Sequence, residues 1–326
     1  MDAQGWARAL TAAVGRVIYG KEQVVEKLLV TLLCRGHALL EDVPGVGKTV
    51  LARALSTCLG GEFRRVQCTP DLLPADVLGG SVYHARTGQF EFRQGPIMTN
   101  ILLVDEINRA TPRTQSALLE AMSEGQISVE GETTALPVPF FMLATENPVE
   151  FEGTFPLPEA QRDRFFLTLR MGYPSPEAEQ EILHSQRRLT HPVTDLEAAT
   201  DLDTVHALQR QVAAVAVEPA TEELILDLVE RTRHDARLAY GASPRASMAL
   251  YQGAQALAAV RGKQTGGAAE VRELAPAVLL KRIGVKPEQL LRGLEPEAVI
   301  DGILNEVLAS HGQAAGGAGA GGGAAG

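Results

Sequence analysis

Residues 40–49 of the chain read LEDVPGVGKT, after an apolar stretch and before a helical pattern. Gly45 and Gly47 can adopt backbone angles that are closed to other residues, so successive N–H groups can curl around phosphates at a helix N-terminus. Lys48 can then reach the β and γ phosphates, and the Thr49 hydroxyl can ligate Mg²⁺. The stretch therefore predicts a phosphate-binding loop between a strand and a helix, with a nucleoside triphosphate as its ligand.

One position departs from the full phosphate-loop pattern, because Asp42 stands where that pattern has a glycine. The match is therefore to the shorter G-x-G-K-T core. This difference is expected to affect the geometry of the loop more than its ability to bind a nucleotide. A glycine turn that only caps a helix is the alternative, and the Lys-Thr pair in a strand–loop–helix context argues against it.

A second motif, ILLVDE at residues 101–106, is an apolar run that ends in two carboxylates. Asp105 would hold Mg²⁺ through its water shell, and Glu106 would orient and deprotonate the water that attacks the γ phosphate. Acidic pairs also occur at solvated strand ends, but next to a phosphate loop the catalytic interpretation is favoured. The expected ligands are ATP and Mg²⁺, with the metal held by Thr49 and Asp105. The residues expected to bind them are Pro44, Gly45, Val46, Gly47, Lys48, Thr49, Val50 and Asp105.

Other polar residues are candidates for the same site. Asn147 follows the fourth apolar run, where it could position the attacking water, although an Asn before Pro is also an ordinary turn starter. Arg245 lies at a helix start, where a cation opposes the helix dipole, and such a local misfit indicates a function. A γ phosphate would turn that repulsion into attraction. Arg109 and Arg162 stay open between the active site and ordinary salt bridges.

Short apolar runs alternate with helical patterns through the first half of the chain, which predicts a parallel sheet between helices. Two further segments, at 81–93 and 125–137, have the alternation and turn residues of β-hairpins. The five runs are 36–41, 62–68, 100–106, 139–146 and 164–169.

No strand pattern follows Leu169, and the remaining segments look helical. Ser175-Pro176 marks a helix start, and Leu224, Ile225, Leu228 and Val229 have amphipathic spacing. We therefore expect an α/β P-loop domain at 1–172 and an all-helical lid domain at 173–311. Residues 312–326 are almost wholly Gly and Ala, which predicts a disordered tail.

The composition and charge of the chain argue against several classes of protein. The net charge of -10 argues against a broad nucleic-acid surface. No run reaches the roughly 18 to 20 apolar residues of a membrane span, and the N-terminus has no signal-peptide pattern, so the cytoplasm is the expected location. Cys34, Cys58 and Cys68 have no C-x-x-C spacing, and buried reduced thiols are expected.

With these elements in order, the chain resembles the AAA+ ATPases and, within them, the MoxR family, over nearly all of residues 17–283. The resemblance implies that the two hairpins are the family's insertions. It implies that Asn147 is sensor 1, that Arg164 is an arginine finger acting on a neighbouring subunit, and that Arg245 is sensor 2. The matching motifs are LLEDVPGVGKT, TPDLLPADVLG, TGQFEFRQGPI, LLVDEINRATPRTQSALLEAMSEGQ, ATENP, FPLPEAQRDRF and GASPRA.

The resemblance also implies an activity and partners. Members of the family form hexameric rings that remodel or activate partner proteins, often with a von Willebrand factor A protein encoded nearby, so a client with such a domain is one expectation. The expected function is therefore ATP-driven, chaperone-like remodelling. Two alternatives stay open: a DNA-directed AAA+ motor, against which the acidic balance of the chain counts, and an ATP-gated scaffold with slow turnover, against which Glu106 and Asn147 count.

Overall fold

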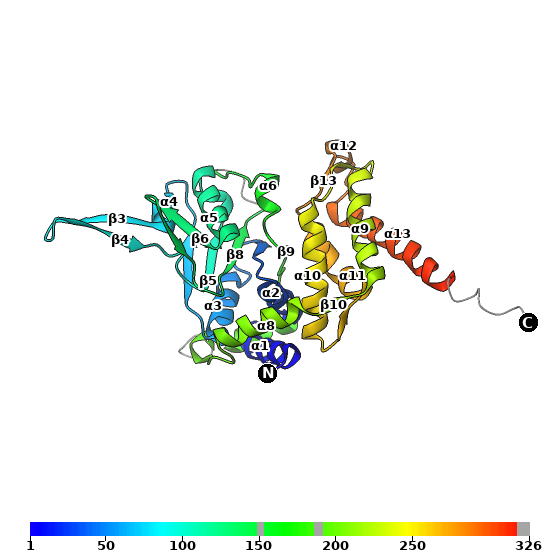
Figure 1. Cartoon of the computed structure of the whole chain (residues 1–326), viewed down its shortest axis with the longest axis horizontal. Helices are drawn as coiled ribbons and strands as arrows, with labels where there is room; N and C mark the ends of the chain where they lie inside the picture. The colour runs from blue at the N-terminus through cyan, green and yellow to red at the C-terminus, as the bar shows by residue number, and fades with distance from the viewer. Residues whose placement is uncertain (149–152, 186–191, 318–326) are drawn as a thin grey trace, which may run out of the picture. The chain divides into compact units, whose positions relative to one another are not determined.

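The structure of the protein is a computed structural model that describes residues 1–148, 153–185 and 192–317, with side chains to residue 311. The chain folds into two compact units, Met1–Gln211 and Val212–Gly326 (Figure 1).

A five-stranded parallel sheet lies at the centre of the first unit, with the strand order β2-β5-β8-β1-β9 (Figure 1). All five strands lie within the predicted apolar runs, so the α/β sheet is confirmed. Every residue of β1 and β5 is buried, so these strands are apolar rather than alternating up to their last residues, Glu41 and Asp105. The strands are β1 (Ala38–Glu41), β2 (Phe63–Gln67), β5 (Ile101–Asp105), β8 (Phe141–Glu146) and β9 (Leu167–Leu169).

Helices of the first unit pack on this sheet and on one another. Leu118 and Leu119 of α5 share a core cluster with Leu102 and Val104 of β5. The α3 helix packs on β2 and β5, and α1 packs on α3. The sheet edge that carries the phosphate loop is thus fixed by a continuous core. These elements are α1 (Ala3–Gly15), α2 (Glu22–Leu33), α3 (Lys48–Leu59), α4 (Pro74–Leu78), η1 (Ile107–Arg109) and α5 (Pro112–Glu124).

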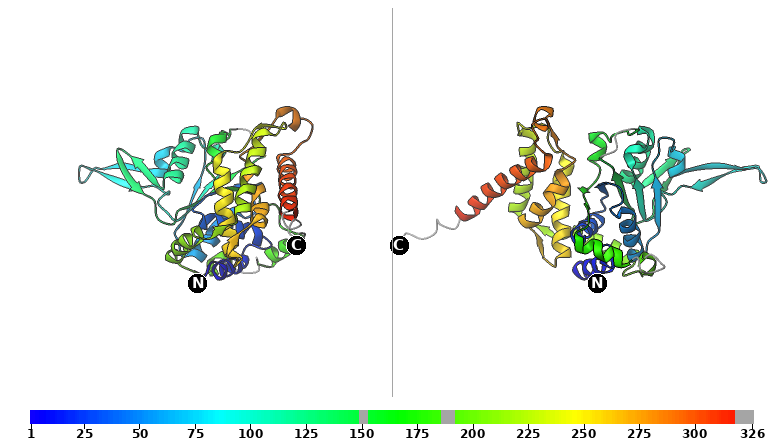
Figure 2. Two further views of the ribbon diagram at one scale, coloured as in Figure 1. Left: turned by 45° about the vertical axis from the view of Figure 1, so that its right-hand side comes forward. Right: turned by 180° about the vertical axis from the view of Figure 1, so that it is seen from behind.

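Two antiparallel hairpins form where the sequence predicts them. One joins β3 (Gly79–His84) to β4 (Gln89–Gln94), and the other joins β6 (Gln126–Val129) to β7 (Glu132–Ala135). The β3–β4 hairpin extends away from the sheet in all views (Figures 1 and 2). Its side chains consequently have little of the protein to pack against, and every residue of β4 is exposed.

Tyr83 and Phe90 are paired across this hairpin, and their ring centroids lie 5.3 Å apart. The two side chains nevertheless remain exposed, at 56% and 73% respectively. Aromatic side chains normally contribute to stability by burial, so these two gain little from the fold of a single chain.

The segments that follow β9 remain attached to the first unit. The side-chain amide of Gln209 donates to the Leu32 carbonyl at 2.8 Å, and the amide of Ala199 donates to the Cys58 carbonyl at 2.8 Å. The boundary between the two units, after Gln211, therefore differs from the domain boundary expected at 172, which stays a prediction. The elements are α6 (Glu159–Arg162), α7 (Pro176–Ser185), η2 (Pro192–Asp195) and α8 (Leu202–Ala213).

The second unit is mainly helical. The amphipathic pattern of residues 224–229 forms α9, with Leu224, Ile225, Leu228 and Val229 buried. Two pairs of very short strands, β10–β12 and β11–β13, add to the expected helices, and they are too short to leave an alternating pattern in the sequence. The elements are β10 (Ala216–Val217), α9 (Pro219–His234), β11 (Leu238–Tyr240), α10 (Pro244–Val260), β12 (Thr265–Gly266), α11 (Ala268–Leu279), β13 (Gly284–Val285), α12 (Pro287–Leu290) and α13 (Pro296–Gly317).

The C-terminal helix is longer than expected. It continues to Gly317, past the boundary at residue 311 that we expect for the lid domain. The disorder of residues 312–326 stays a prediction. The rest of the expected tail, 318–326, lies outside the described residues. Within the described part of the chain, no helix is long and apolar enough to cross a membrane.

All three cysteines are free thiols. Cys58 and Cys68 are buried as expected, whereas Cys34 is partly exposed. Burial raises the pKa of the Cys68 thiol to about 12, and the nearby Asp105 and Glu106 carboxylates act in the same direction. Cys68 is therefore an unreactive thiol at neutral pH.

Candidate active site

The strand order brings the predicted motifs to one edge of the sheet. Strand β8 lies between β1 and β5, and all three are parallel. The phosphate loop follows β1, Asp105 ends β5, and Asn147 follows β8, so these residues meet at the carboxyl edge where ligands bind in open α/β folds. Asn147 is buried there.

The phosphate loop has the backbone that the sequence predicts. Gly47 has a φ of 96°, in the left-handed region, and it is the N-cap of α3. A side chain at this position would be strained by the backbone conformation, although there is space for it. Pro44, Gly45 and Val46 complete the loop, whereas Thr49 and Val50 lie in the first turn of α3.

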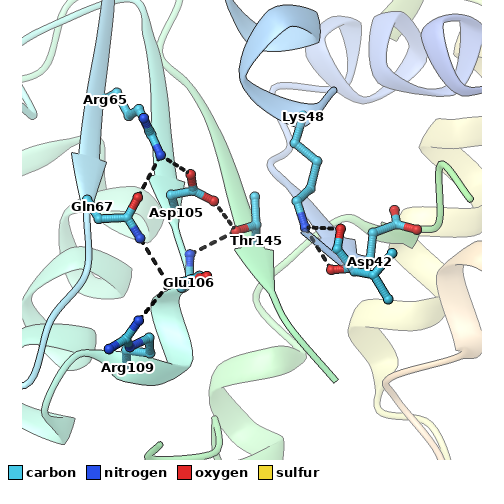
Figure 3. A network of polar contacts seen from close by, with 9 residues as sticks. Asp42, Lys48, Arg65, Gln67, Asp105, Glu106, Arg109 and Thr145 are labelled. Atoms are coloured by element: carbon cyan, nitrogen blue, oxygen red, sulfur yellow. Dashed lines mark hydrogen bonds and ion pairs between the residues drawn. The ribbon is translucent and has the colours of Figure 1, made fainter. Parts of the chain in front are cut away.

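Lys48 is buried and is held by its own loop (Figure 3). Its ammonium group donates to the main-chain carbonyls of Asp42 at 2.7 Å and Val43 at 3.3 Å. Burial lowers the pKa of Lys48, and the Asp42, Asp105 and Glu106 carboxylates act in the opposite direction. A phosphate group would offer this partly desolvated cation stronger acceptors than two neutral carbonyls.

Asp105 is fixed on both carboxylate oxygens. Oδ1 accepts a hydrogen bond from the Thr145 hydroxyl at 2.7 Å, and Oδ2 forms an ion pair with Arg65 at 2.6 Å (Figure 3). The register of the sheet explains the first contact, because Val104 of β5 lies beside Ala144 of β8. Arg65 comes from the neighbouring strand β2.

Glu106 is held in an unusual backbone conformation. Its φ is 56°, a left-handed value that costs a non-glycine residue about 1 to 3 kcal/mol. Its amide donates to the Thr145 hydroxyl at 2.8 Å, while its carboxylate accepts from Gln67 at 3.0 Å and from Arg109 at 3.2 Å. This set of bonds orients the carboxylate at the edge of the sheet (Figure 3).

Three residues of this network were absent from the site that the sequence predicts: Arg65, Gln67 and Thr145. Thr145 lies within the ATENP motif, but its hydroxyl gains a role only because β8 is placed beside β5. Arg65 and Gln67 are two positions apart on β2, so they face the same side of the sheet. Two polar side chains on one face, separated by Val66, were the available signal in the sequence.

The candidate arginines lie in different places. Arg109 contacts the Glu106 carboxylate, as stated above, and so it reaches the site. Arg164 is exposed, and its guanidinium donates to the Leu119 carbonyl at 3.1 Å near the end of α5. Arg162 is partly exposed in α6. Arg245 belongs to the second unit, in the first turn of α10, where its amide donates to the Ser243 hydroxyl at 3.1 Å.

A cavity of about 170 Å³ adjoins the phosphate loop. We call it the loop-side cavity. It lies wholly within the first unit, and its walls include the backbone of Gly45 and Gly47. The lining is largely apolar, which suits a flat heterocyclic ring better than a charged group. The apolar residues that shape it include Val17, Ile18, Val46, Val50, Met171 and Ile182.

Comparisons with known proteins agree with this fold and site. The sequence model of the ATPase family associated with various cellular activities (AAA) matches residues 37–167 of this chain. The sequence model of the AAA lid domain matches residues 230–303. A chain from Cytophaga hutchinsonii of known crystal structure has a TM-score of 0.87 and 34% identity, over 93% of this chain and 94% of that one. The fold and the site thus define an AAA ATPase, which binds and hydrolyses ATP.

Individual relatives narrow the class. Chaperone MoxR1 of Mycobacterium tuberculosis is 42% identical over 305 residues, which cover 90% of this chain and 80% of that protein. The uncharacterized protein YeaC of Bacillus subtilis is 47% identical over 294 residues, covering 90% and 92%. Protein MoxR of Paracoccus denitrificans is 30% identical over 93% of this chain and 95% of its own. The chain belongs to the MoxR family of AAA+ ATPases.

Proposed function

We propose that the protein is a cytoplasmic, ring-forming ATPase that remodels or matures partner proteins in the manner of a chaperone. The observation that carries this proposal is the β3–β4 hairpin, which extends from the ATPase unit with Tyr83 and Phe90 exposed. A hairpin of this kind offers a surface through which nucleotide-driven motion can act on a client. The relative named Chaperone MoxR1 supports the same activity.

ATP hydrolysis would use the residues at the carboxyl edge of the sheet. Lys48 neutralises the β and γ phosphates, and the phosphate-loop amides hold them. Glu106 orients the attacking water and accepts its proton, and Asn147 positions the same water. The orienting bonds of Glu106 to Gln67 and Arg109 support this role, because a general base must be held in place before it can act.

Mg²⁺ is the expected metal, and the residues present fit it. Thr49 supplies a hydroxyl oxygen and Asp105 a carboxylate oxygen, and Mg²⁺ prefers such hard oxygen ligands. When bound, the metal neutralises charge on the phosphates. Oδ2 of Asp105 is paired with Arg65, so this carboxylate would serve both Arg65 and the water shell of the metal.

The ring assembly follows from the proposed role of Arg164. An arginine finger stabilises charge on the transferred phosphoryl group, and when a neighbouring subunit supplies it, catalysis depends on assembly. The exposure of Arg164 and its bond to α5 leave its guanidinium at a surface of its own chain. Arg245 would sense the γ phosphate from the lid domain. We propose a hexamer, with a client that includes a von Willebrand factor A domain.

Mixing two inactive variants tests the shared site. Arg164→Ala lacks the donated arginine, and Lys48→Ala lacks a competent pocket, so each should be inactive alone. A mixed ring contains interfaces in which the intact pocket of an Arg164→Ala subunit faces the intact Arg164 of a Lys48→Ala subunit. Partial ATPase activity should therefore return on mixing, measured as phosphate release after subunit exchange. If mixing under exchange conditions restored no activity, a finger acting in trans would be contradicted.

A further inference from the structure

Asp42, the residue that departs from the phosphate-loop pattern, has a buried carboxylate with two backbone partners. Oδ2 accepts a hydrogen bond from the Met171 amide at 2.6 Å, and Oδ1 accepts one from the Gly172 amide at 2.9 Å. Gly172 has a left-handed φ of 63°, so two successive amides point at one carboxylate. This is the geometry of an anion-binding nest.

The loop backbone does not require a glycine at position 42. Among the described residues, the positive-φ positions that are not glycine do not include Asp42. Its main chain instead connects two parts of the site: the amide donates to the Glu146 carbonyl at 3.2 Å, and the carbonyl accepts from Lys48 at 2.7 Å. One residue therefore joins the phosphate-binding lysine to the segment that follows β9.

Lys21 holds the same segment from its carbonyl side. Its ammonium group donates to the Met171 carbonyl and, at 2.9 Å, to the Tyr173 carbonyl. Residues 171–173 are thus fixed by a carboxylate on their amides and by an ammonium group on their carbonyls. The buried Met171 lines the loop-side cavity, and so does Lys21 itself.

We propose that Asp42 is a positioning residue for the base of the nucleotide. It acts through the backbone of Met171, which it holds against the loop-side cavity, while Gly45 and Gly47 shape the part of the loop that binds phosphates. This inference rests on the nucleotide site proposed above and on placing the base in the loop-side cavity. It explains why this chain keeps an aspartate where the pattern has a glycine.

The test separates binding of the base from binding of the phosphates. Affinities for ATP and for inorganic tripolyphosphate, which has no base, are measured by calorimetry in a Glu106→Gln parent, in which ATP hydrolysis is strongly slowed. Asp42→Gly restores the pattern glycine but removes both bonds, and it should weaken ATP binding by about tenfold or more. Tripolyphosphate affinity should stay within about twofold of the parent.

Three further variants keep the result interpretable. Lys21→Met removes the ammonium group that holds residues 171–173 from their carbonyl side. It should therefore also weaken ATP binding more than tripolyphosphate binding, and it provides this test even if Asp42→Gly does not fold. Asp42→Asn keeps one acceptor and should give an intermediate loss. Glu41→Gln is the matched control, because Glu41 is an adjacent buried carboxylate whose partner is the Arg170 side chain at 2.8 Å. It should leave the ratio of the two affinities unchanged.

Four outcomes would overturn the inference. An equal loss of ATP and tripolyphosphate affinity in Asp42→Gly would mean that Asp42 acts on the phosphate loop. Unchanged ATP affinity in both Asp42→Gly and Lys21→Met would remove the positioning role. The same selective loss in Glu41→Gln would make the effect unspecific. If the Glu106→Gln parent bound neither ligand, the proposed nucleotide site itself would be wrong, and this inference with it.

Discussion

At the scale of one residue, Lys48 is a buried cation that could bind an anionic ligand. Its ammonium group is bonded to two carbonyls of its own loop, and burial lowers its pKa. Neutral carbonyls satisfy the donor but compensate its charge only partly. A bound phosphate would therefore be a stronger partner for this ammonium group than the carbonyls are.

Replacing Lys48 should weaken ATP binding without unfolding the protein. Lys48→Ala should lower ATP affinity by about a hundredfold or more, because charge-assisted bonds to the phosphates are lost. Calorimetry measures the affinity, and an unchanged circular dichroism spectrum and melting temperature show that the fold persists. Glu106→Gln is the comparison: it should bind ATP normally and hydrolyse it about 10² to 10⁴ times more slowly. Hydrolysis at the wild-type rate would exclude Glu106 as the general base.

Thr145 offers a second residue-scale prediction. Its hydroxyl accepts from the Glu106 amide and donates to the Asp105 carboxylate, and it is fully buried. Thr145→Val keeps the shape but removes the hydrogen bonds to the Glu106 amide and to Oδ1 of Asp105, so the free energy of unfolding should fall by about 1 to 3 kcal/mol and the turnover rate should fall with it. Denaturant unfolding and phosphate release measure the two effects. Thr145→Ser, which keeps the hydroxyl, should retain most of the activity.

At the scale of secondary-structure elements, His37, which immediately precedes β1, connects that strand to β8 and α5. Its Nδ1 accepts from the Met142 amide of β8 at 3.0 Å, and its Nε2 contacts the Met122 carbonyl of α5 at 3.1 Å. The Met142 amide is a hydrogen-bond donor, so Nδ1 must be the unprotonated nitrogen of the ring. Nε2 therefore carries the proton, and the ring is neutral. Burial lowers the pKa of His37 from 6.5 to about 4.

The depressed pKa of His37 predicts a pH dependence of stability. The unfolded chain binds a proton at His37 below about pH 6.5, but the folded chain does so only below about pH 4. The contribution to the free energy of unfolding is thus complete above pH 6.5 and is lost as the pH falls toward 4. Between pH 7 and 5 the loss should be about 2 kcal/mol.

Denaturant unfolding of His37→Gln provides the control for that prediction. Other groups titrate over the same range, so the informative quantity is the difference between wild type and variant. The wild type should lose about 2 kcal/mol more than His37→Gln between pH 7 and 5. Equal losses in the two proteins would show that His37 is not the group responsible.

At the scale of the whole molecule, the proposed function depends on more than one chain. If neighbouring subunits share each site, ATPase activity per subunit should rise with protein concentration as rings form, and level off when assembly is complete. Phosphate release across a dilution series, with light scattering on the same samples, measures both quantities. A flat activity profile for a demonstrated monomer would contradict the shared site.

From the sequence alone we could predict the sheet, both hairpins and the two motifs that we expect to bind the nucleotide. Each of these features has a pattern that can be recognised within a short stretch of the sequence. Burial on both faces makes β1 and β5 apolar up to their final carboxylates, and the phosphate loop needs Gly45 and Gly47 at positive φ whatever lies around it. Such local requirements leave a readable pattern, so the class of protein followed from the sequence.

Only the tertiary structure decided which side chains support those motifs. Thr145, Arg65 and Gln67 reach the acidic motif because β8 and β2 flank β5 in a particular register, and no spacing along the chain encodes that order. Likewise, Asp42 meets the amides of residues 171 and 172 because β9 lies beside β1. Interactions between residues far apart in sequence depend on strand order, which the packing of the whole core determines.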